Sequence, residues 1–179
     1  MEFSNNPELG SVSPDFTIEL RIKTSGWSSD PSILSNKNWG TGFNKGFIIA
    51  GNTDGSTWKF NMGDGSNRID INGGTIDDNE WHRLVVSYDA DGDKIVYQDG
   101  AIVNSSTVNI SSNTNSGLAL ALMQDGTLNY TAALGAEVSE VRIWNAALSS
   151  GLIQDYGCTT VDNTHPCLLY TSPSPRDRG

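Results

Sequence analysis

The sequence is poor in cysteine, in basic residues and in long apolar runs. Two cysteines, Cys158 and Cys167, have none of the recurrent paired spacing of a disulfide framework. Eleven Lys and Arg residues against 21 Asp and Glu give a net charge of −10, which disfavours binding to nucleic acid or to an anionic membrane surface. No apolar run approaches the roughly 20 residues that span a bilayer, so membrane insertion is not expected.

The sequence also lacks the common catalytic and metal-binding motifs. It contains no His/Cys metal cluster, no Ser/His/Asp order and no phosphate-binding loop. The first residues, MEFSNNPELG, have neither a basic start nor an apolar signal core. If the parent protein is secreted, we expect its signal to lie outside this piece.

What the sequence does contain is a period of two between apolar and polar residues. Phe16, Ile18, Leu20 and Ile22 alternate with polar residues, which gives a strand one face to bury. Similar patterns recur in TWKFNM, RIDI, HRLVVSY and GLALALM, and the turn signals NTDGS, GDGSN, ADGD and QDG lie between strands. This spacing predicts an all-β fold, an antiparallel two-sheet jelly-roll sandwich.

One short helix and one long loop interrupt this pattern. The segment LSSGLIQDY predicts a helix of a turn or two near the C-terminus, with Ser149 as its N-cap and Gly157 as its stop. The segment SNKNWGTGFNKG, residues 35–46, is the longest stretch without strand character before the tail. Long loops on a rigid sandwich often carry binding residues.

Three blocks of sequence, taken in order, resemble a known family. They are DFTIELRIKTSGW with the later ILSNKNW, then the stretch from GSTWKFNM to VYQDGAIV that includes EWHRLVVSYD, and finally GAEVSEVRIWNAALSSGLIQDY. Over residues 1 to about 157 they resemble the laminin G-like, concanavalin A-like jelly-roll domains of multidomain secreted and cell-surface proteins, bacterial ones especially. The resemblance implies an extracellular or cell-surface location and other domains in a larger parent chain.

The C-terminal end departs from that family pattern. Such domains usually continue with a glycine, an aliphatic residue and an aromatic-rich strand, whereas this chain continues with CTTVDNTHP and CLLYTSPSPRDRG. The latter resembles the translation of a transposase-type sequencing adapter. We therefore expect a laminin G-like domain over residues 1–166, truncated at both ends, and a non-native tail over residues 167–179. Cys158 would then lack its native partner.

An enzyme is one alternative, because glucanases share this fold. Retaining hydrolysis needs two carboxyl groups about 5 to 5.5 Å apart. The nearest pair, Glu137 and Glu140, is three residues apart and would face opposite sides of a regular strand. Trp81 and His82 open an otherwise apolar strand, which predicts a buried aromatic and a hydrogen-bonded histidine instead of a catalytic one. Catalysis is therefore not expected.

Calcium is the one cofactor that the sequence leaves open. The segment DADGDKIVYQDG resembles a calcium loop, but Lys94 stands where the sharp-turn glycine belongs and Gly100 where a bidentate Glu should close the site. A hairpin is therefore favoured there. Many jelly-roll lectin-like domains hold one Ca²⁺, and the remaining candidate ligands are Asp64 and Asp125, each in an Asp-Gly turn.

A sugar-binding site is expected in the long loop and the GDGSN turn. Sugars bind by stacking on an aromatic ring and by hydrogen bonds from amide and carboxylate groups to their hydroxyls. An equally supported alternative is that the loop tryptophan plugs one end of the sandwich and the asparagines satisfy the loop backbone. The candidate ligand-binding residues are Asn36, Asn38, Trp39, Asn44, Asp64 and Asn67.

Together these observations predict a non-catalytic extracellular recognition module. Its expected ligand is a carbohydrate or another surface protein, with calcium assisting. The first alternative is a structural or adhesive spacer domain of a multidomain surface protein. A glycoside hydrolase-like jelly roll is the third possibility, because one scaffold hosts many functions.

Overall fold

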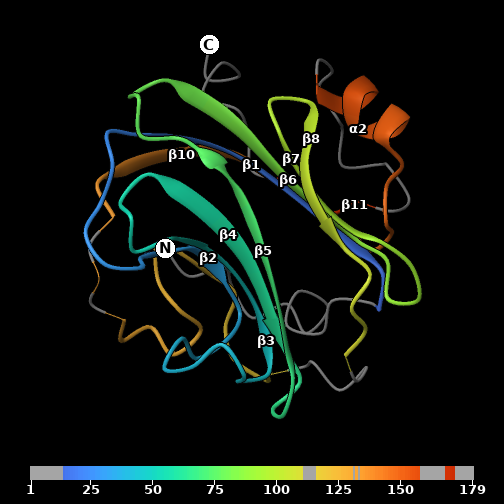
Figure 1. Ribbon diagram of the computed structural model, residues 1–179, viewed down its shortest axis with the longest axis horizontal. Coiled ribbons are helices and arrows are strands. Elements are labelled where there is room, and N and C mark those ends of the chain that lie inside the picture. The colour runs from blue at the N-terminus through green and yellow to red at the C-terminus, as the bar shows by residue number, and fades with distance from the viewer. Residues whose placement is uncertain (1–13, 111–115, 131, 133, 158–167, 172–179) are drawn as a thin grey trace.

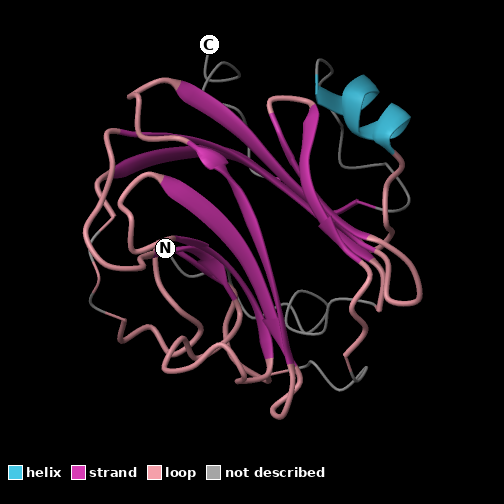
Figure 2. Ribbon diagram, in the orientation of Figure 1, coloured by secondary structure: helices cyan, strands magenta, loops and turns pink. Residues whose placement is uncertain are grey.

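The computed structural model describes residues 14–110, 116–130, 132, 134–157 and 168–171, which form two antiparallel sheets packed face to face (Figures 1 and 2). The six-stranded sheet has the order β11-β10-β1-β6-β7-β8 and the five-stranded sheet the order β5-β4-β3-β2-β9. The predicted all-β jelly-roll sandwich is confirmed. The strands are β1 (Phe16–Thr24), β2 (Ser32–Ser35), β3 (Gly46–Gly51), β4 (Thr57–Gly63), β5 (Arg68–Thr75), β6 (Trp81–Tyr88), β7 (Lys94–Gln98), β8 (Ala101–Ser106), β9 (Ala121–Leu122), β10 (Ala136–Trp144) and β11 (Leu168–Thr171).

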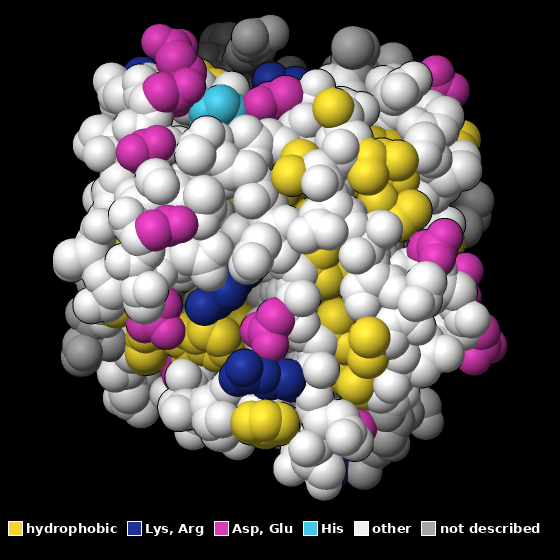
Figure 3. Space-filling view, in the orientation of Figure 1, with side chains coloured by type: hydrophobic (Ala, Val, Ile, Leu, Met, Phe, Trp, Pro, Cys, Tyr) yellow, Lys and Arg dark blue, Asp and Glu magenta, His cyan; other side chains and the backbone are white. Residues whose placement is uncertain are grey.

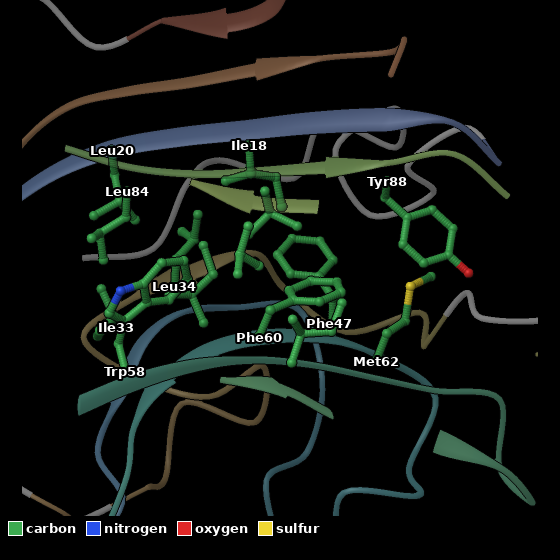
Figure 4. Close-up of a cluster of buried hydrophobic side chains, with 14 of the residues drawn as sticks. Ile18, Leu20, Ile33, Leu34, Phe47, Trp58, Phe60, Met62, Leu84 and Tyr88 are labelled. Carbon is green, nitrogen blue, oxygen red and sulfur yellow. The ribbon is translucent and has the colours of Figure 1, made fainter. Parts of the chain in front are cut away.

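The main hydrophobic core lies between the two sheets, as Figure 4 shows. The period of two in each strand sends alternate side chains into this layer. The ring of Phe16 stacks on Tyr88 with 4.8 Å between centroids, and Phe47 and Phe60 of the other sheet pack at 5.8 and 6.3 Å from Phe16. Each such buried side chain stabilises the fold by about 1.5–3 kcal/mol.

A second cluster lies on the outer side of the six-stranded sheet, beneath helix α2 (Ser150–Gly157). The helix is on the side of this sheet away from the five-stranded sheet (Figure 2). Ile153 of the helix belongs to the same cluster as Val85 and Trp144 of the sheet. The predicted short helix is confirmed, and Ser149 precedes it, with its hydroxyl accepting a hydrogen bond from the amide of Leu152 (3.4 Å).

Three arginines of the six-stranded sheet hold the C-terminal end of α2. Arg21, Arg83 and Arg142 donate to the carbonyls of Gly157 (3.2 Å), Ile153 (2.7 Å) and Tyr156 (2.9 Å) respectively. Cations are favoured there because the last carbonyls of a helix have no partner inside the helix. Glu19, which is 1% exposed, joins this network, with its carboxylate 2.7 Å from Arg83 and 3.5 Å from Arg142.

The hairpin between β6 and β7 contains the segment that resembles a calcium loop. The amide of Asp89 donates to the carbonyl of Asp93 (3.2 Å), which closes the turn. The buried ammonium group of Lys94 donates to the carbonyls of Ala90 (3.1 Å) and Gly92 (2.8 Å) and to the side-chain oxygen of Asn109. The ammonium group of Lys94 thus binds two carbonyls of the turn directly.

The C-terminal segment 168–171 forms strand β11, which pairs antiparallel with β10. The domain limit at residue 166 and the non-native origin of the tail stay predictions. Cys158, Cys167 and the first 13 residues lie outside the described residues. Within the described part of the chain, no helix has the length and apolar character of a membrane span.

Trp81 and His82 begin β6. His82 is hydrogen-bonded as predicted, with Nδ1 2.8 Å from Asp99 Oδ2 and Nε2 3.0 Å from Asp78 Oδ1. The prediction that Trp81 is buried is wrong, because its side chain is 42% exposed. It lies on the outer face of the sheet at the very start of the strand, whereas the buried outer residues Arg83 and Val85 lie farther along β6.

The two carboxylates around His82 predict a pH-dependent stability. Burial lowers the pKa of His82, but the hydrogen bonds and charges of Asp99 and Asp78 together outweigh burial and raise the pKa above 6.5. The protonated His82 therefore adds to the free energy of unfolding. This stabilisation is fully present when the pH is below the pKa that His82 has in the unfolded chain, and it is lost as the pH rises through the higher pKa of the folded state. The loss of unfolding free energy caused by His82→Gln should therefore be larger at pH 5.5 than at pH 8.5 in urea denaturation. An equal loss at both pH values would contradict this assignment.

Candidate ligand-binding site

The loop after β2 folds over the outer face of the five-stranded sheet. In β3, Phe47 and Ile49 face the core, so Ile48 and Ala50 face outward. Trp39 of the loop packs on these two outward residues, with Tyr130 beside it, and is only 8% exposed. The loop is therefore packed as a layer against the outer face of the sheet.

Hydrogen bonds fix Trp39 in this position. Its indole Nε1 donates to the carbonyl of Asp30 (3.1 Å), and its amide donates to Asp125 Oδ2 (2.9 Å). The hydroxyl of Tyr130 donates to Asp30 Oδ1 (2.8 Å). Burial raises the pKa of the Tyr130 hydroxyl, and the bond to Asp30 raises it further. Two segments far apart in the sequence, around Asp30 and over residues 125–130, thus position the ring.

A buried lysine connects the loop to strands β4 and β5. Lys37 Nζ donates to the carbonyl of Gly42 (2.9 Å) and to Asn61 Oδ1 (2.6 Å), and Asn61 donates to Asp70 Oδ1 (3.0 Å). Burial lowers the pKa of Lys37 to about 8, the Asp70 carboxylate opposes this shift, and the charge of Arg68 adds to it. At neutral pH the lysine stays charged, so the network holds the loop electrostatically.

The exposed part of this layer combines an aromatic ring with charged groups. Phe43 at the loop tip is 44% exposed, and the Arg68 guanidinium lies 4.9 Å from its ring centroid. Arg68 Nε also pairs with Asp70 Oδ2 (2.8 Å), while Lys59 Nζ lies 5.1 Å from the Trp39 ring centroid. In Figure 3, basic, acidic and hydrophobic side chains gather in the lower part of the face, over β3, β4 and this loop. We call Asn38, Phe43, Lys59, Asn67, Arg68 and Asp70 the Phe43 surface.

The structure places the predicted asparagines of the loop in different environments. Asn36 is buried, and its Oδ1 accepts from the amide of Phe47 (2.8 Å). Asn38 is exposed and its Oδ1 accepts from the amide of Gly40 (2.7 Å), while Asn44 donates to the carbonyl of Asn38 (3.0 Å). Asn38 is therefore the most accessible of the three to a ligand.

The predicted turn residues lie next to the loop. Asp64 Oδ1 accepts from the amides of Ser66 (2.8 Å) and Asn67 (2.6 Å), and the amide of Gly65 donates to the carbonyl of Phe43 (2.8 Å). The structure thus brings the turn and the loop together, as the shared site requires. The ligand-binding roles of all six predicted residues stay predictions.

Four residues of the Phe43 surface are not among those predicted from the sequence, namely Phe43, Lys59, Arg68 and Asp70. Phe43 lies inside the loop that was singled out, so its apolar ring among polar neighbours was the available signal. Arg68 and Asp70 occupy the polar positions of the RIDI alternation, so the sequence predicts that they face solvent. It does not predict that the loop after β2 lies beside them.

The two predicted metal ligands serve other contacts. Asp125 Oδ1 accepts from the amide (2.9 Å) and hydroxyl (2.6 Å) of Thr127, and its Oδ2 binds Trp39. Asp64 organises its own turn. Among the described residues, no group of three or more His, Cys, Asp or Glu side chains could hold a metal ion. Calcium binding stays a prediction.

The two carboxylates considered for catalysis are arranged differently from the expectation of a regular strand. The pairing of β1 with β10 shifts register between Glu19 and Arg21, and Glu140 has a φ of 52°. Its carboxylate lies 2.8 Å from Arg21 Nε on the outer side of the sheet, where Glu137 also faces. The expectation that they face opposite sides is therefore wrong, because the strand is irregular at Glu140.

Comparison with solved structures shows the same fold in carbohydrate-binding and toxin domains. The CBM40 domain of the Ruminococcus gnavus IT-sialidase has a TM-score of 0.68 at 14% identity, covering 87% of this chain and 90% of that domain. A putative carbohydrate binding protein from Bacteroides ovatus ATCC 8483 has a TM-score of 0.68 at 14% identity, covering 96% of this chain and 47% of that chain. The binding domain of botulinum neurotoxin serotype C1 has a TM-score of 0.61 at 16% identity, covering 87% of this chain and 39% of that chain.

The chain thus spans nearly all of the sialidase domain but less than half of the other two chains. At these identities the likeness shows the fold alone. No curated protein sequence is significantly similar to this chain. A family model described as the concanavalin A-like lectin/glucanases superfamily, of laminin G type, matches residues 2–154. With two antiparallel sheets in the expected arrangement, the chain belongs to the laminin G-like domains of the concanavalin A-like lectin/glucanase superfamily.

Proposed function

We propose that the protein is a non-catalytic extracellular carbohydrate-binding module whose ligand lies on the Phe43 surface. The observation that carries the proposal is the exposed Phe43 ring beside the Arg68–Asp70 ion pair. An aromatic ring contacts the apolar face of a sugar, and charged or amide groups exchange hydrogen bonds with its hydroxyls. The similarity in fold to a sialidase CBM40 domain and to a putative carbohydrate binding protein supports this choice.

The geometry of the loop also supports binding. Arg68 uses Nε for Asp70, and no hydrogen bond or ion pair within the described residues uses its terminal nitrogens. Lys37, Asn61 and Asp70 hold the loop in place before any ligand arrives. A preorganised surface loses less conformational entropy on binding, which favours affinity.

Loss of the Phe43 ring should weaken polysaccharide binding about tenfold, because truncating a central aromatic contact commonly costs at least 1 kcal/mol of binding free energy. The measurement is affinity electrophoresis in native gels that contain cellulose ethers, xylan, galactomannan or polygalacturonate. Phe43→Ala and Arg68→Ala are compared with Leu152→Ala, which removes an exposed apolar side chain from helix α2. Melting temperatures of all variants verify that the fold is retained.

The gels also separate the alternatives. Retardation of wild type that is unchanged in Phe43→Ala and Arg68→Ala would refute the Phe43 surface, and no retardation by any polysaccharide would favour a structural spacer. Release of reducing ends from a polysaccharide would favour an enzyme. Running the gels with calcium and with excess EDTA tests whether calcium assists binding, because EDTA removes the free calcium ion.

A further inference from the structure

Trp81 is the most exposed tryptophan among the described residues of the chain. Trp58 and Trp144 are fully buried, Trp39 is 8% exposed and Trp27 is partly buried, whereas Trp81 is 42% exposed. Burying a tryptophan is strongly favourable, and a lone exposed one on a rigid strand is enriched at binding sites. Trp81 lies on the six-stranded sheet, on the opposite side of the sandwich from the Phe43 surface.

Two charged residues lie in the same cross-strand row as Trp81. Lys23 of β1 is paired with Trp81 of β6 on one side and with Glu137 of β10 on the other. All three face outward, because alternate residues of these strands fill the core. With neighbouring strands about 4.8 Å apart, the row spans about 10 Å across three strands at one end of the sheet.

The polar groups of this row have no hydrogen-bonding partner in the described part of the chain. Within the described residues, no hydrogen bond or ion pair uses the Trp81 indole N–H, the Lys23 ammonium group or the Glu137 carboxylate. The neighbouring row differs, because Arg21 and Arg83 are held by carboxylates and by the end of helix α2. The row therefore offers one aromatic face, two kinds of donor and one acceptor to solvent.

We propose that Trp81, Lys23 and Glu137 form a second saccharide-binding site, which binds a neutral sugar ring of a polysaccharide. The opposite charges of Lys23 and Glu137 balance, so the row has no preference for an anionic ligand. The indole stacks on the apolar face of the ring, while the ammonium group donates to sugar hydroxyls and the carboxylate accepts from them. This site does not depend on the Phe43 surface, and the two would contact different polysaccharide strands.

Removal of the Trp81 ring tests the proposal in native gels that contain hydroxyethyl cellulose, barley β-glucan, xylan or galactomannan. Trp81→Ala should raise the dissociation constant at least about tenfold for a polysaccharide that retards wild type, and Trp81→Phe should retain part of the affinity. The matched control is Ile102→Ala, which removes a 58% exposed apolar side chain from β8 of the same sheet. Melting temperatures establish that each variant folds.

A second readout follows the ring itself. Saturating soluble β-glucan should protect wild type from acrylamide quenching of tryptophan fluorescence, and this protection should disappear in Trp81→Phe. Equal retardation of Trp81→Ala and wild type, or no retardation of wild type by any of the four polysaccharides, would overturn the proposal. Because Phe43→Ala is run in the same gels, failure of the Trp81 site is distinguishable from failure of the Phe43 surface.

Discussion

Glu19→Ala should lower the free energy of unfolding by about 3–5 kcal/mol, because it leaves two buried arginines without their shared carboxylate. Glu19 is 1% exposed and lies against both Arg83 and Arg142. These arginines also hold the carbonyls of Ile153 and Tyr156, so the variant weakens the attachment of helix α2 to the sheet. Urea denaturation followed by circular dichroism measures the change.

The matched control is Glu140→Ala, which breaks another arginine–glutamate pair of the same sheet. The side chains of Arg21 and Glu140 are 33% and 17% exposed, so solvent screens their interaction, and we expect a loss of about 0–1 kcal/mol. Glu19→Gln, which keeps the shape and one acceptor oxygen, should lie between the two. Equal losses for Glu19→Ala and Glu140→Ala would show that the shared carboxylate has no special role.

Trp58→Ala should also lower the free energy of unfolding by about 3–5 kcal/mol, because it empties a large site in the core. Trp58 is 0% exposed, and its indole lies against Gly73, where any side chain would overlap the ring. Its Nε1 donates to Gln98 Oε1 (2.9 Å) across the two sheets. The variant therefore creates a cavity and also removes the hydrogen-bond donor to the Gln98 side chain. Chemical denaturation measures the total loss of unfolding free energy.

Two further variants isolate the cause of that loss. Trp81→Ala removes the same side chain from an exposed position and should change the unfolding free energy by no more than about 0.5 kcal/mol. Gly73→Ala adds a methyl group against the indole and should cost about 1–3 kcal/mol through overpacking. A small effect of Trp58→Ala beside a large effect of Gly73→Ala would point to backbone strain at Gly73 instead.

The fold was predictable because every core strand repeats a local pattern. The alternation in β1 and β6 predicts which residues face the opposite sheet, but not that the outward-facing Glu19 and Arg83 are also buried. The helix was predictable from its cap and stop residues. The irregularity at Glu140 was not, because a positive φ at a non-glycine residue depends on contacts with Arg21 that come from another strand.

The candidate site was predictable only as a region. The absence of strand character indicated that the loop around Trp39 could bind a ligand. Which aromatic ring of the loop is exposed was not predictable, because exposure depends on tertiary packing. Trp39 is covered because Ile48 and Ala50 present a small apolar patch beneath it, and Phe43 is left outside. The exposure of Trp81 was missed because the outer face of β6 is buried only farther along the strand, at Arg83 and Val85, and the sequence pattern does not show where that cover ends.

The ammonium group of Lys94 has a consequence for the environments in which the domain keeps its shape. Because this cation is tethered to the chain, it cannot be diluted, chelated or replaced by a competing ion in the medium. The carbonyls of Ala90 and Gly92 therefore keep the same cationic partner in calcium-rich and calcium-depleted surroundings. A hairpin whose carbonyls are held by a cation of the chain itself is suited to a protein whose ionic surroundings change.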